Sequence, residues 1–236
     1  MTTEQIYGRR AVREALRGPR EVRELWVSER ALKAEPWLNE PGPGVRPRVM
    51  AERELSELVG TRDHQGVVAA VEPYRYADGY ELAAVENPLL VCLDQVTDPH
   101  NLGAVLRSAE GAGATGVIVP AHGSARVTAA VCRASAGAVE HVRLAVVPNL
   151  ARFLGDVKGA NLWVYGAAGE GTPMWSADLT GGAAFVFGAE GRGPRPLVRK
   201  TCDALVSIPL AGKVESLNVS VAAGILLYEA RRQRGA

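Results

Sequence analysis

Three apolar segments in the second half of the chain each run directly into a loop of glycines and polar side chains. They lie at residues 89–94, 183–187 and 204–208, and the loops after them read QVTDPHNLGAV, GAEGRGP and PLAGKVESLNV. Short apolar runs of this kind are typical of strands buried in a sheet. Because open α/β sheets bind ligands where their strands end, we expect the three loops to form one composite site.

Strand and helix patterns alternate from residue 88 to the end of the chain. Further strands are expected at 116–119, 142–147 and 161–165, and helices at 101–112, 126–135, 149–157, 195–200 and 218–233. Strands separated by helices favour a mostly parallel sheet that is covered on both faces. The sequence therefore predicts the α/β class for this region.

The first 72 residues predict a second, smaller α/β unit. Its expected elements are helices at 9–17 and 51–58 and strands at 22–27 and 66–71, with a proline- and glycine-rich loop at 39–48. The tyrosine-rich stretch 73–87 is bounded by prolines and is typical of a linker. We therefore predict domains at 1–72 and 88–236, joined by the linker 73–87.

The amino-acid composition limits the classes of function that the chain can have. The 27 basic and 26 acidic residues leave a net charge of +1, so the whole chain lacks the basic excess of many nucleic-acid binders. Arginines nevertheless cluster near the N-terminus, and Arg9 and Arg10 are candidates either for a solvated helix face or for contacts with RNA phosphates. No apolar stretch reaches membrane-spanning length and no secretory signal precedes the first unit, so we expect a cytoplasmic protein without a membrane partner.

The cysteines and histidines do not suggest a metal site. The three cysteines are far apart and form no C-x-x-C pair, and the four histidines share no metal-ligand spacing. Small buried thiols are the better interpretation of the cysteines. We expect no bound metal.

The segment GAGATG at 111–116 matches the dinucleotide-binding fingerprint letter by letter. That fingerprint requires a strand before the glycines and a helix after them. Here the order is reversed, because a helix precedes the glycines and the strand VIVP follows. We interpret the segment as a helix end and a tight turn, which weakens the case for a nicotinamide oxidoreductase.

Polar residues of the three loops are the candidates for chemistry. Asn101 either caps a helix or contacts a ligand, and Arg107 either pairs with Glu110 or contacts a substrate. Glu190 follows the second apolar segment among glycines that permit close approach of the backbone. Ser216 and Asn218 bracket Leu217, and each is either the cap of the last helix or a functional group.

Taken together, the segments NLGAVLRSAEGAG, FVFGAEGRG and SIPLAGKVESLNVSVAAGILLYE resemble the three motifs of the SpoU (TrmH) branch of the SPOUT superfamily of RNA ribose methyltransferases. The resemblance covers residues 89–232. The first 72 residues resemble the small RNA-binding domain of the ribosomal RNA members, which is similar to kink-turn-binding ribosomal proteins. The resemblance implies a homodimer, a SPOUT-type parallel sheet and a C-terminal trefoil knot, a rare exception to the rule against threaded connections.

The resemblance also implies S-adenosylmethionine as cofactor and assigns residues to its site. Cofactor contacts would come largely from the backbone of loops at Gly166–Ala167, Gly188 and Ile208–Leu210, and from Leu217. The catalytic residues of the family correspond to Asn101, Arg107, Glu190, Ser216 and Asn218. In the family Arg107 would be the base, but a free guanidinium is almost always protonated near neutral pH. We therefore expect it to bind substrate phosphate and stabilise the developing alkoxide.

The implied reaction is methylation of a ribose 2′-hydroxyl in large-subunit ribosomal RNA, with guanosine as the expected nucleoside. The RNA-binding domain favours ribosomal RNA, by analogy of fold alone. A transfer RNA enzyme and an antibiotic-resistance ribosomal RNA enzyme remain alternatives within the same chemistry. A non-catalytic, dimeric RNA-binding protein is the alternative of a different class.

Overall fold

The computed structural model describes residues 2–42, 44–159, 161–189 and 193–235. The chain forms two compact units. The N-terminal unit comprises Met1–Arg75 together with Arg126–His141. The C-terminal unit comprises Tyr76–Ala125 and Val142–Ala236.

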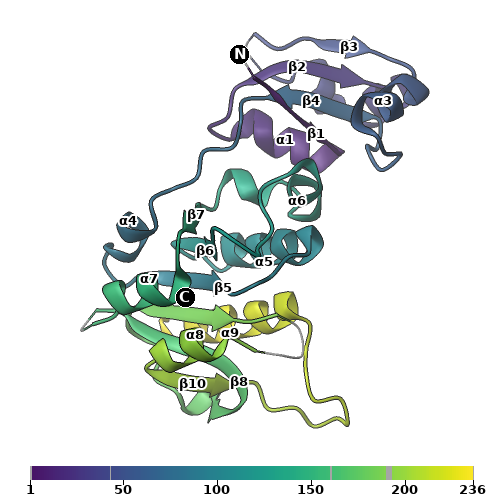
Figure 1. Cartoon of the computed structure of the whole chain (residues 1–236). Coiled ribbons are helices and arrows are strands. Elements are labelled where there is room, and N and C mark those ends of the chain that lie inside the picture. The colour runs from purple at the N-terminus through teal and green to yellow at the C-terminus, as the bar shows by residue number, and fades with distance from the viewer. Residues whose placement is uncertain (1, 43, 160, 190–192, 236) are drawn as a thin grey trace. The chain divides into compact units, whose positions relative to one another are not determined.

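The C-terminal unit is built on a parallel sheet in the order β10-β8-β9-β5-β6-β7 (Figure 1). Its strands are β5 (Leu89–Leu93), β6 (Gly116–Pro120), β7 (Leu144–Val147), β8 (Trp163–Pro173), β9 (Ala183–Phe187) and β10 (Ala204–Ser207). Every residue of β5, β6 and β9 is buried, as expected for strands covered on both faces. The predicted α/β class and parallel sheet are confirmed.

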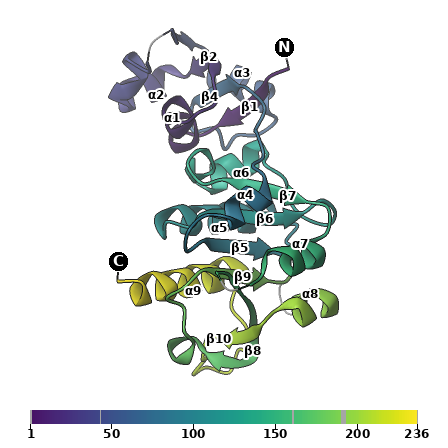
Figure 2. The same ribbon diagram turned by 90° about the vertical axis from the view of Figure 1, so that its left-hand side faces the viewer.

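Helices cover both faces of this sheet, as Figure 2 shows for α5 and α9 on one side and α7 and α8 on the other. They are α4 (Gly79–Ala83), α5 (Pro99–Gly111), α7 (Leu150–Val157), α8 (Pro196–Thr201) and α9 (Val219–Gln233), with a 3₁₀ turn η3 (Met174–Ser176). Leu82, Phe153 and Val198 bring α4, α7 and α8 into one apolar cluster with the strands. Leu106 of α5 and Leu226 of α9 are buried on the other face.

Helices α5 and α9 pack closely because small residues line their contact. A Cβ at Gly224 would lie 3.5 Å from the Ser108 hydroxyl, and one at Gly111 would lie 3.1 Å from the Tyr228 hydroxyl. Asn101 and Asn218, near the starts of the two helices, are hydrogen-bonded to each other. The contacts advance together along both helices, so α5 and α9 run side by side in the same direction.

The N-terminal unit has a mixed sheet in the order β1-β4-β2-β3. Its strands are β1 (Glu4–Tyr7), β2 (Val22–Val27), β3 (Pro47–Val49) and β4 (Val67–Val71). Its helical segments are α1 (Arg9–Arg17), α2 (Glu29–Ala34), η1 (Pro36–Asn39), α3 (Glu52–Val59), α6 (Ala129–Ala134) and η2 (Ala138–Glu140). Strand β4 lies in the centre, antiparallel to β1 and β2.

A buried ion pair joins the segment Arg126–His141 to the rest of the N-terminal unit. The Arg20 guanidinium donates to both carboxylate oxygens of Glu140, and the Glu140 side chain is fully buried. Burial works to lower the pKa of Arg20, but the hydrogen bond and the charge of Glu140 raise it above its usual value. Arg20 also donates to the sulfur of Cys132 and lies over the Tyr74 ring. The arginine therefore stays charged inside this unit.

Three sequence predictions about organisation differ from the structure. Residues 73–87 are not a free linker, because Ala77 bonds to β7 and Leu82 of α4 enters the apolar cluster. Residues 126–141 were expected in the C-terminal domain but group with the N-terminal unit. The strand expected at 161–165 extends to Pro173, and β1, α2, β3 and α4 were not predicted.

The GAGATG segment is a helix end, as predicted. Helix α5 ends at Gly111, Gly113 has a φ of 72°, and β6 begins at Gly116. Within the described residues, no helix is long and apolar enough to cross a membrane. The same residues contain no group of three or more histidines, cysteines or carboxylates that could hold a metal ion.

Candidate functional site

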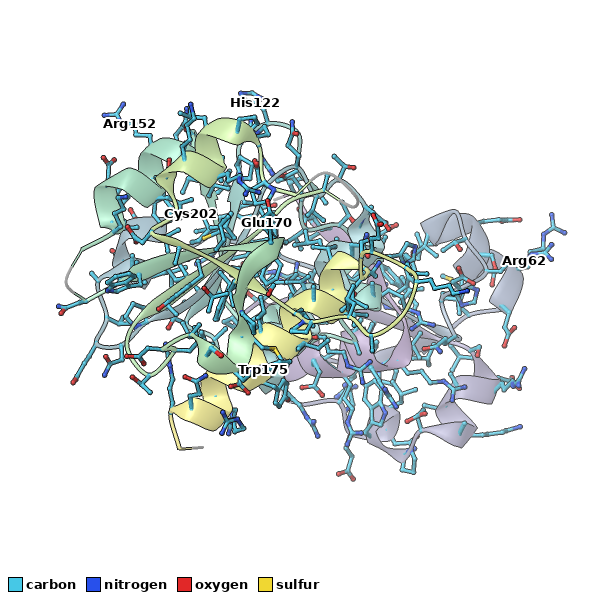
Figure 3. All side chains as sticks on the ribbon, turned by 90° about the horizontal axis from the view of Figure 1, so that it is seen from below. Arg62, His122, Arg152, Glu170, Trp175 and Cys202 are labelled. Carbon is cyan, nitrogen blue, oxygen red and sulfur yellow. The ribbon has the colours of Figure 1, made fainter. Side chains whose placement is uncertain are left out.

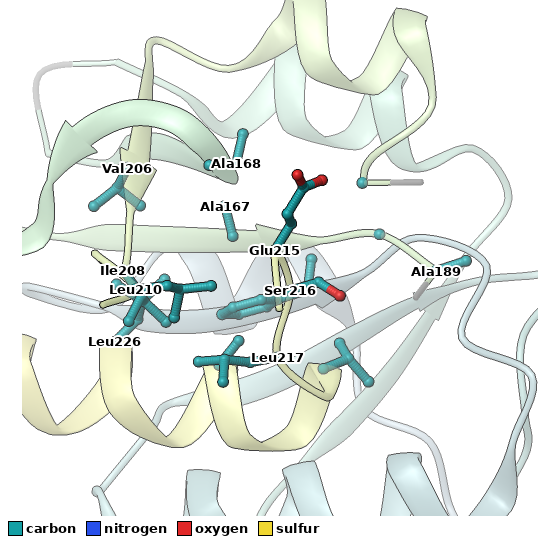
Figure 4. Close-up of a pocket in the computed structure, with 16 residues that line it drawn as sticks. Ala167, Ala168, Ala189, Val206, Ile208, Leu210, Glu215, Ser216, Leu217 and Leu226 are labelled. Atoms are coloured by element: carbon teal, nitrogen blue, oxygen red, sulfur yellow. The ribbon is translucent and has the colours of Figure 1, made fainter. Parts of the chain in front are cut away.

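A cavity of about 250 Å³ lies at the carboxyl ends of the neighbouring strands β8, β9 and β10 (Figure 4). Strand β8 contributes Ala167, Ala168 and Gly169, and the end of β9 contributes Phe187, Gly188 and Ala189, with Gly193 beyond. The remaining lining comes from β10, the chain after it and α9, and comprises Val206, Ile208, Leu210, Glu215, Ser216, Leu217, Val219, Ala222 and Leu226. Two of the three loops singled out in the sequence, those after β9 and β10, thus line this cavity, whereas the loop after β5 contributes no lining residue.

An irregularity in β8 forms one wall of the cavity. Leu205 of β10 pairs with Gly166, but the next residue, Val206, pairs with Thr172. Residues 167–171 are therefore looped out of the ladder between these two pairs. Such bulges redirect the backbone next to ligand sites. A Cβ at Gly171 would lie 2.6 Å from backbone atoms of Leu205 and Val206. A glycine at this position therefore allows β8 and β10 to resume their pairing after residues 167–171.

Gly188 is the tightest point of the second loop. A Cβ at this position would lie 1.8 Å from the backbone of Gly193, and Ala189 and Gly193 form an isolated bridge. Two backbone segments can approach this closely only where no side chain intervenes. At Gly188 and Gly193, therefore, backbone rather than side chains lines the cavity.

A buried carboxylate anchors the far end of the same loop. Asp94, at the end of β5, is 1% exposed and accepts from the Arg195 backbone N–H at 2.8 Å. The Arg195 guanidinium donates to it through Nε at 2.9 Å and through a terminal nitrogen at 2.8 Å. Charge-assisted hydrogen bonds of this type are shorter and stronger than those between neutral groups. Neither residue was singled out from the sequence, although Asp94 ends the first apolar segment and could have been suspected there.

The lining is mainly apolar, with few polar side chains. Figure 4 shows Ile208, Leu210 and Leu226 gathered on one side, whereas the carboxylate of Glu215 points away from them. Ser216 and Glu215 are the polar side chains that line the cavity within the described residues. An apolar slot with backbone groups and a few polar side chains suits a flat, partly polar ligand such as a nucleoside.

Five of the six residues expected at a cofactor line this one cavity: Ala167, Gly188, Ile208, Leu210 and Leu217. Gly166 does not line it, because it lies within the sheet, paired with both Leu205 and Val186. Ala168, Gly169, Gly193 and Glu215 line the cavity without having been expected. The bulge in β8 brings Ala168 and Gly169 to the cavity, and a run of alanines and glycines gives no sequence pattern that would predict such a bulge.

Asn218 and Asn101 come together although they are far apart in sequence. The Asn218 amide donates to the Asn101 amide oxygen at 2.9 Å. The Asn218 side-chain oxygen also accepts from the Ser220 N–H at 2.9 Å and from its hydroxyl at 2.6 Å, which caps α9. Asn218 therefore caps α9 and also bonds to Asn101 of α5. Asn101 is not the cap of α5, because Asp98 holds that position.

Arg107 lies six residues beyond Asn101 on α5, about 9 Å along the helix axis. Its side chain is exposed, and it forms no ion pair with Glu110 or with any other residue that the structure describes. An exposed guanidinium without a carboxylate partner is available for a phosphate. Glu190 was also expected in the site, and it lies outside the described residues.

The two arginines expected to contact RNA have different surroundings in the N-terminal unit. Arg9 is half-buried, and its guanidinium bonds to Glu35 at 3.1 Å and to the Gln65 carbonyl at 3.2 Å. Arg10 is exposed. Within the described part of the chain, Arg9 lines a second cavity together with Arg30 and Arg62, and Arg10 does not.

Comparison with known families and proteins gives one consistent result. Residues 88–228 match the model of the SpoU rRNA methylase family, and residues 5–77 match the model described as RNA 2′-O ribose methyltransferase substrate binding. The chain is 45% identical over 243 residues to the 23S rRNA (guanosine-2′-O-)-methyltransferase RlmB of Vibrio vulnificus. That alignment covers 99% of this chain and 98% of the relative.

Solved structures agree with this result. The SpoU methyltransferase AviRb from Streptomyces viridochromogenes, in complex with AdoMet, is 29% identical and superimposes with a TM-score of 0.80, covering 99% of this chain and 91% of that one. A structure described as an RNA 2′-O ribose methyltransferase is 31% identical with a TM-score of 0.83. It covers 98% of this chain and 89% of its own.

Proposed function

The chain belongs to the SpoU rRNA methylase family, and on that premise we propose that it methylates a ribose 2′-hydroxyl of 23S ribosomal RNA, at a guanosine. The methyl donor is S-adenosylmethionine. The observation that carries the proposal is the cavity at the ends of β8, β9 and β10, because five residues expected at the cofactor meet there. We assign the enzyme to the cytoplasm, where it would meet its RNA.

The cavity suits S-adenosylmethionine in shape and in chemistry. Much of its lining is aliphatic, and Gly188 and Gly193, whose backbones approach closely, bring no side chain into it. Adenosine offers a flat apolar face and edges that bond to backbone groups, which is what the looped strand ends present. When bound, the sulfonium supplies an electrophilic methyl group.

The chain's own residues would align and activate the attacking sugar. We assign Arg107 to a phosphate next to the target ribose, where its fork also stabilises charge developing on the 2′-oxygen. The Asn101–Asn218 pair positions the start of α9, and with it Ser216 and Leu217 at the cavity. Holding the two reactants in line could lower the barrier by about 7–11 kcal/mol. Glu190 is included among the catalytic residues only because of the family resemblance.

A trefoil knot remains part of the proposal. Residues 208–218 connect edge strand β10 to α9, which packs on α5 and contacts β9 in the interior of the sheet. This long return from the edge, together with the loop at 167–171, supports a threaded C-terminus. The small residues between α5 and α9 are consistent with the close backbone crossings that such a path needs.

We further propose that the enzyme is a homodimer. Val221 and Tyr228 are seven residues apart on α9, about half exposed, and so lie on one face of the helix. Val214 is 74% exposed in the loop before it. Exposed apolar side chains grouped in this way are typical of an association surface.

The N-terminal unit supports ribosomal RNA over transfer RNA as the substrate. Residues 5–77 match a substrate-binding model, and the 23S rRNA relative aligns over this unit as well as over the C-terminal unit. We therefore assign residues 1–72 to RNA binding and residues 88–236 to catalysis. A transfer RNA enzyme or an antibiotic-resistance enzyme would use the same site on another RNA.

Incubation with methyl-labelled S-adenosylmethionine and separate pools of RNA tests the proposal. Deproteinised 23S RNA, 16S RNA and transfer RNA are compared under identical conditions. We expect label in 23S RNA, within one oligonucleotide whose target linkage resists alkali. Label confined to transfer RNA would overturn the assigned substrate. Failure to label any RNA or assembled particle would overturn the enzymatic assignment.

A further inference from the structure

A basic cavity of about 370 Å³ lies in the N-terminal unit, separate from the cofactor cavity. Its lining comes from the starts of α1, α2 and α3 and from the turn before β4, and comprises Arg9, Arg30, Glu52, Arg62, His64, Gln65 and Gly66. We propose that this cavity holds a backbone phosphate of the substrate RNA. The inference rests on the proposed function and extends it to named RNA contacts.

The charges of the lining favour an anion. Three arginines face one carboxylate, Glu52, and Arg9 has its own partner in Glu35. Arg30 and Arg62 are exposed, and neither forms an ion pair or a side-chain hydrogen bond with any part of the chain that the structure describes. Figure 3 shows the Arg62 side chain extending away from the ribbon.

Several other exposed arginines of this unit are paired with carboxylates, whereas Arg10, Arg13 and Arg46 are exposed without an ion pair among the described residues but do not line this cavity. Arg48 bonds to Glu24 at 2.9 Å, and Arg53 bonds to Glu57 at 2.9 Å. Arg17 and Arg23 are also paired with carboxylates. Among the described residues, Arg30 and Arg62 are therefore the lining arginines of this cavity that form no ion pair, and both guanidinium groups are available to a ligand.

The turn beneath the arginines is held rigidly. His64 is buried, its Nδ1 accepts from the Gly66 N–H at 3.0 Å, and its Nε2 bonds to the Ser56 hydroxyl at 2.9 Å. The Ser56 hydroxyl in turn donates to the Glu52 carbonyl, so His64 donates to Ser56. This chain of bonds ties the turn to the first residue of α3.

Gln65 is strained within this turn. Its φ is 54°, a left-handed conformation that is strained for a residue with a side chain. Its side-chain oxygen accepts the Arg9 N–H and its carbonyl accepts the Arg9 Nε, both at 3.2 Å. Gly66 follows with a φ of 75°, and a Cβ there would lie 2.3 Å from the Ser28 hydroxyl. The surrounding structure therefore maintains a strained turn that orients Arg9.

Phosphate is the group that this arrangement fits. Planar guanidinium forks match the oxygens of a phosphodiester, and a preformed cavity lowers the entropy lost on binding. Each phosphate neutralised releases counterions, so the logarithm of RNA affinity falls with the logarithm of salt concentration by about 0.7–0.9 per contact. The proposal therefore predicts a measurable change in salt dependence.

The test compares two double variants of the full-length enzyme. Arg30→Ala/Arg62→Ala removes the free arginines, and Arg48→Ala/Arg53→Ala removes two paired ones with the same change in net charge. Affinity for 23S RNA is measured at several salt concentrations, with thermal unfolding as a check on folding. We expect the first variant to bind RNA about tenfold or more weakly at low salt, and the slope of log affinity against log salt to fall by about 0.7–0.9, the value for one phosphate contact.

Two further variants strengthen the test. Arg30→Lys/Arg62→Lys should keep most of the salt slope but regain only part of the affinity, because lysine keeps the charge and loses the fork. Glu52→Gln should bind RNA more tightly than the unaltered enzyme, because the repelling carboxylate is gone. The Michaelis constant for RNA should follow these affinities, whereas affinity for S-adenosylmethionine should not change.

The outcomes separate this proposal from the proposed function. If the unaltered enzyme methylates 23S RNA but the alanine pair matches the paired-arginine control in slope and Michaelis constant, the cavity is not an RNA contact. If a polyglutamate peptide competes with RNA for the cavity as well as a non-substrate RNA of equal charge does, the assignment to phosphate is overturned. If the unaltered enzyme methylates no RNA, the function itself fails.

Discussion

The amide nitrogen of Asn218 lies 2.9 Å from the amide oxygen of Asn101, and this hydrogen bond joins residues 117 positions apart. It links the first turns of α5 and α9, which then pack side by side. Asn218 accepts from Ser220 with its oxygen while it donates to Asn101 with its nitrogen. Only an amide offers both groups in this geometry, because a carboxylate accepts and does not donate.

Two substitutions of Asn218 should separate capping from positioning. Asn218→Asp keeps the cap of α9 but cannot donate to Asn101, so we expect near-normal stability and at least a tenfold loss of kcat. Asn218→Ala should lose the same activity and, in addition, about 1 kcal/mol of stability. Chemical denaturation and single-turnover methyl transfer measure the two effects. Full activity in Asn218→Asp would show that the bond to Asn101 is not needed.

Gly188→Ala should abolish binding of S-adenosylmethionine. The added methyl group would lie 1.8 Å from the Gly193 backbone, so the loop that borders the cavity must move. Gly212→Ala is the matched control, because a Cβ there would meet no atom within 4 Å. Calorimetric titration should give a dissociation constant at least tenfold higher for the first variant and unchanged for the second. Equal affinities would place the cofactor elsewhere.

Arg107→Lys tests the role assigned to the guanidinium. A lysine keeps the charge but cannot contact a phosphate with two parallel bonds, so we expect kcat to fall about tenfold or more at every pH. Arg152→Lys, on the opposite face of the sheet, should behave as the unaltered enzyme does. Recovery of near-full activity by Arg107→Lys at high pH would instead favour a base at this position.

The Asp94–Arg195 pair should respond unequally to removal of its two members. Arg195→Ala leaves a carboxylate that is 1% exposed without its guanidinium, whereas Asp94→Ala leaves an arginine whose side chain is 47% exposed and can bind water. We therefore expect Arg195→Ala to cost more, by on the order of 1–3 kcal/mol. Urea denaturation of both variants measures the difference. The reverse order would contradict the account of the buried carboxylate.

Alkaline pH should destabilise the N-terminal unit through Cys132. Burial raises the pKa of this thiol to about 11, whereas an unfolded cysteine titrates near 8.5. The unfolded state therefore loses its proton first as pH rises, and the free energy of unfolding falls between about pH 9 and pH 11. Cys132→Ala should show a shallower decline over this interval. Identical pH profiles would show that the thiol does not titrate as proposed.

Elements with a strong local pattern could be predicted from the sequence, and those that depend on distant contacts could not. Strand β2 and helix α1 have the predicted bounds, because the spacing of apolar residues within each segment matches its secondary structure. Strand β3 has three residues and follows a stretch of prolines and glycines, so no local signal predicts it. The β8 bulge depends on its pairing with β10, which lies about forty residues further along the chain.

The candidate site shows the same division. The motifs predicted a site at the loops after β9 and β10, and both loops line the cavity because their parallel strands end at the same edge of the sheet. The direct bond between Asn101 and Asn218, and the anchoring of the 188–195 loop by Asp94, depend on side-chain positions that spacing does not encode. In the N-terminal unit, spacing drew attention to Arg9 and Arg10, whereas the free guanidinium groups of the cavity belong to Arg30 and Arg62.

Nucleoside analysis of 23S RNA after reaction tests the central claim most directly. RNA from cells that lack the enzyme is incubated with it and methyl-labelled S-adenosylmethionine, digested to nucleosides and separated by chromatography with mass detection. The account predicts that the label appears in 2′-O-methylguanosine, with the methyl group on the ribose fragment. Label in a base-methylated nucleoside, with an unmodified ribose, would contradict it.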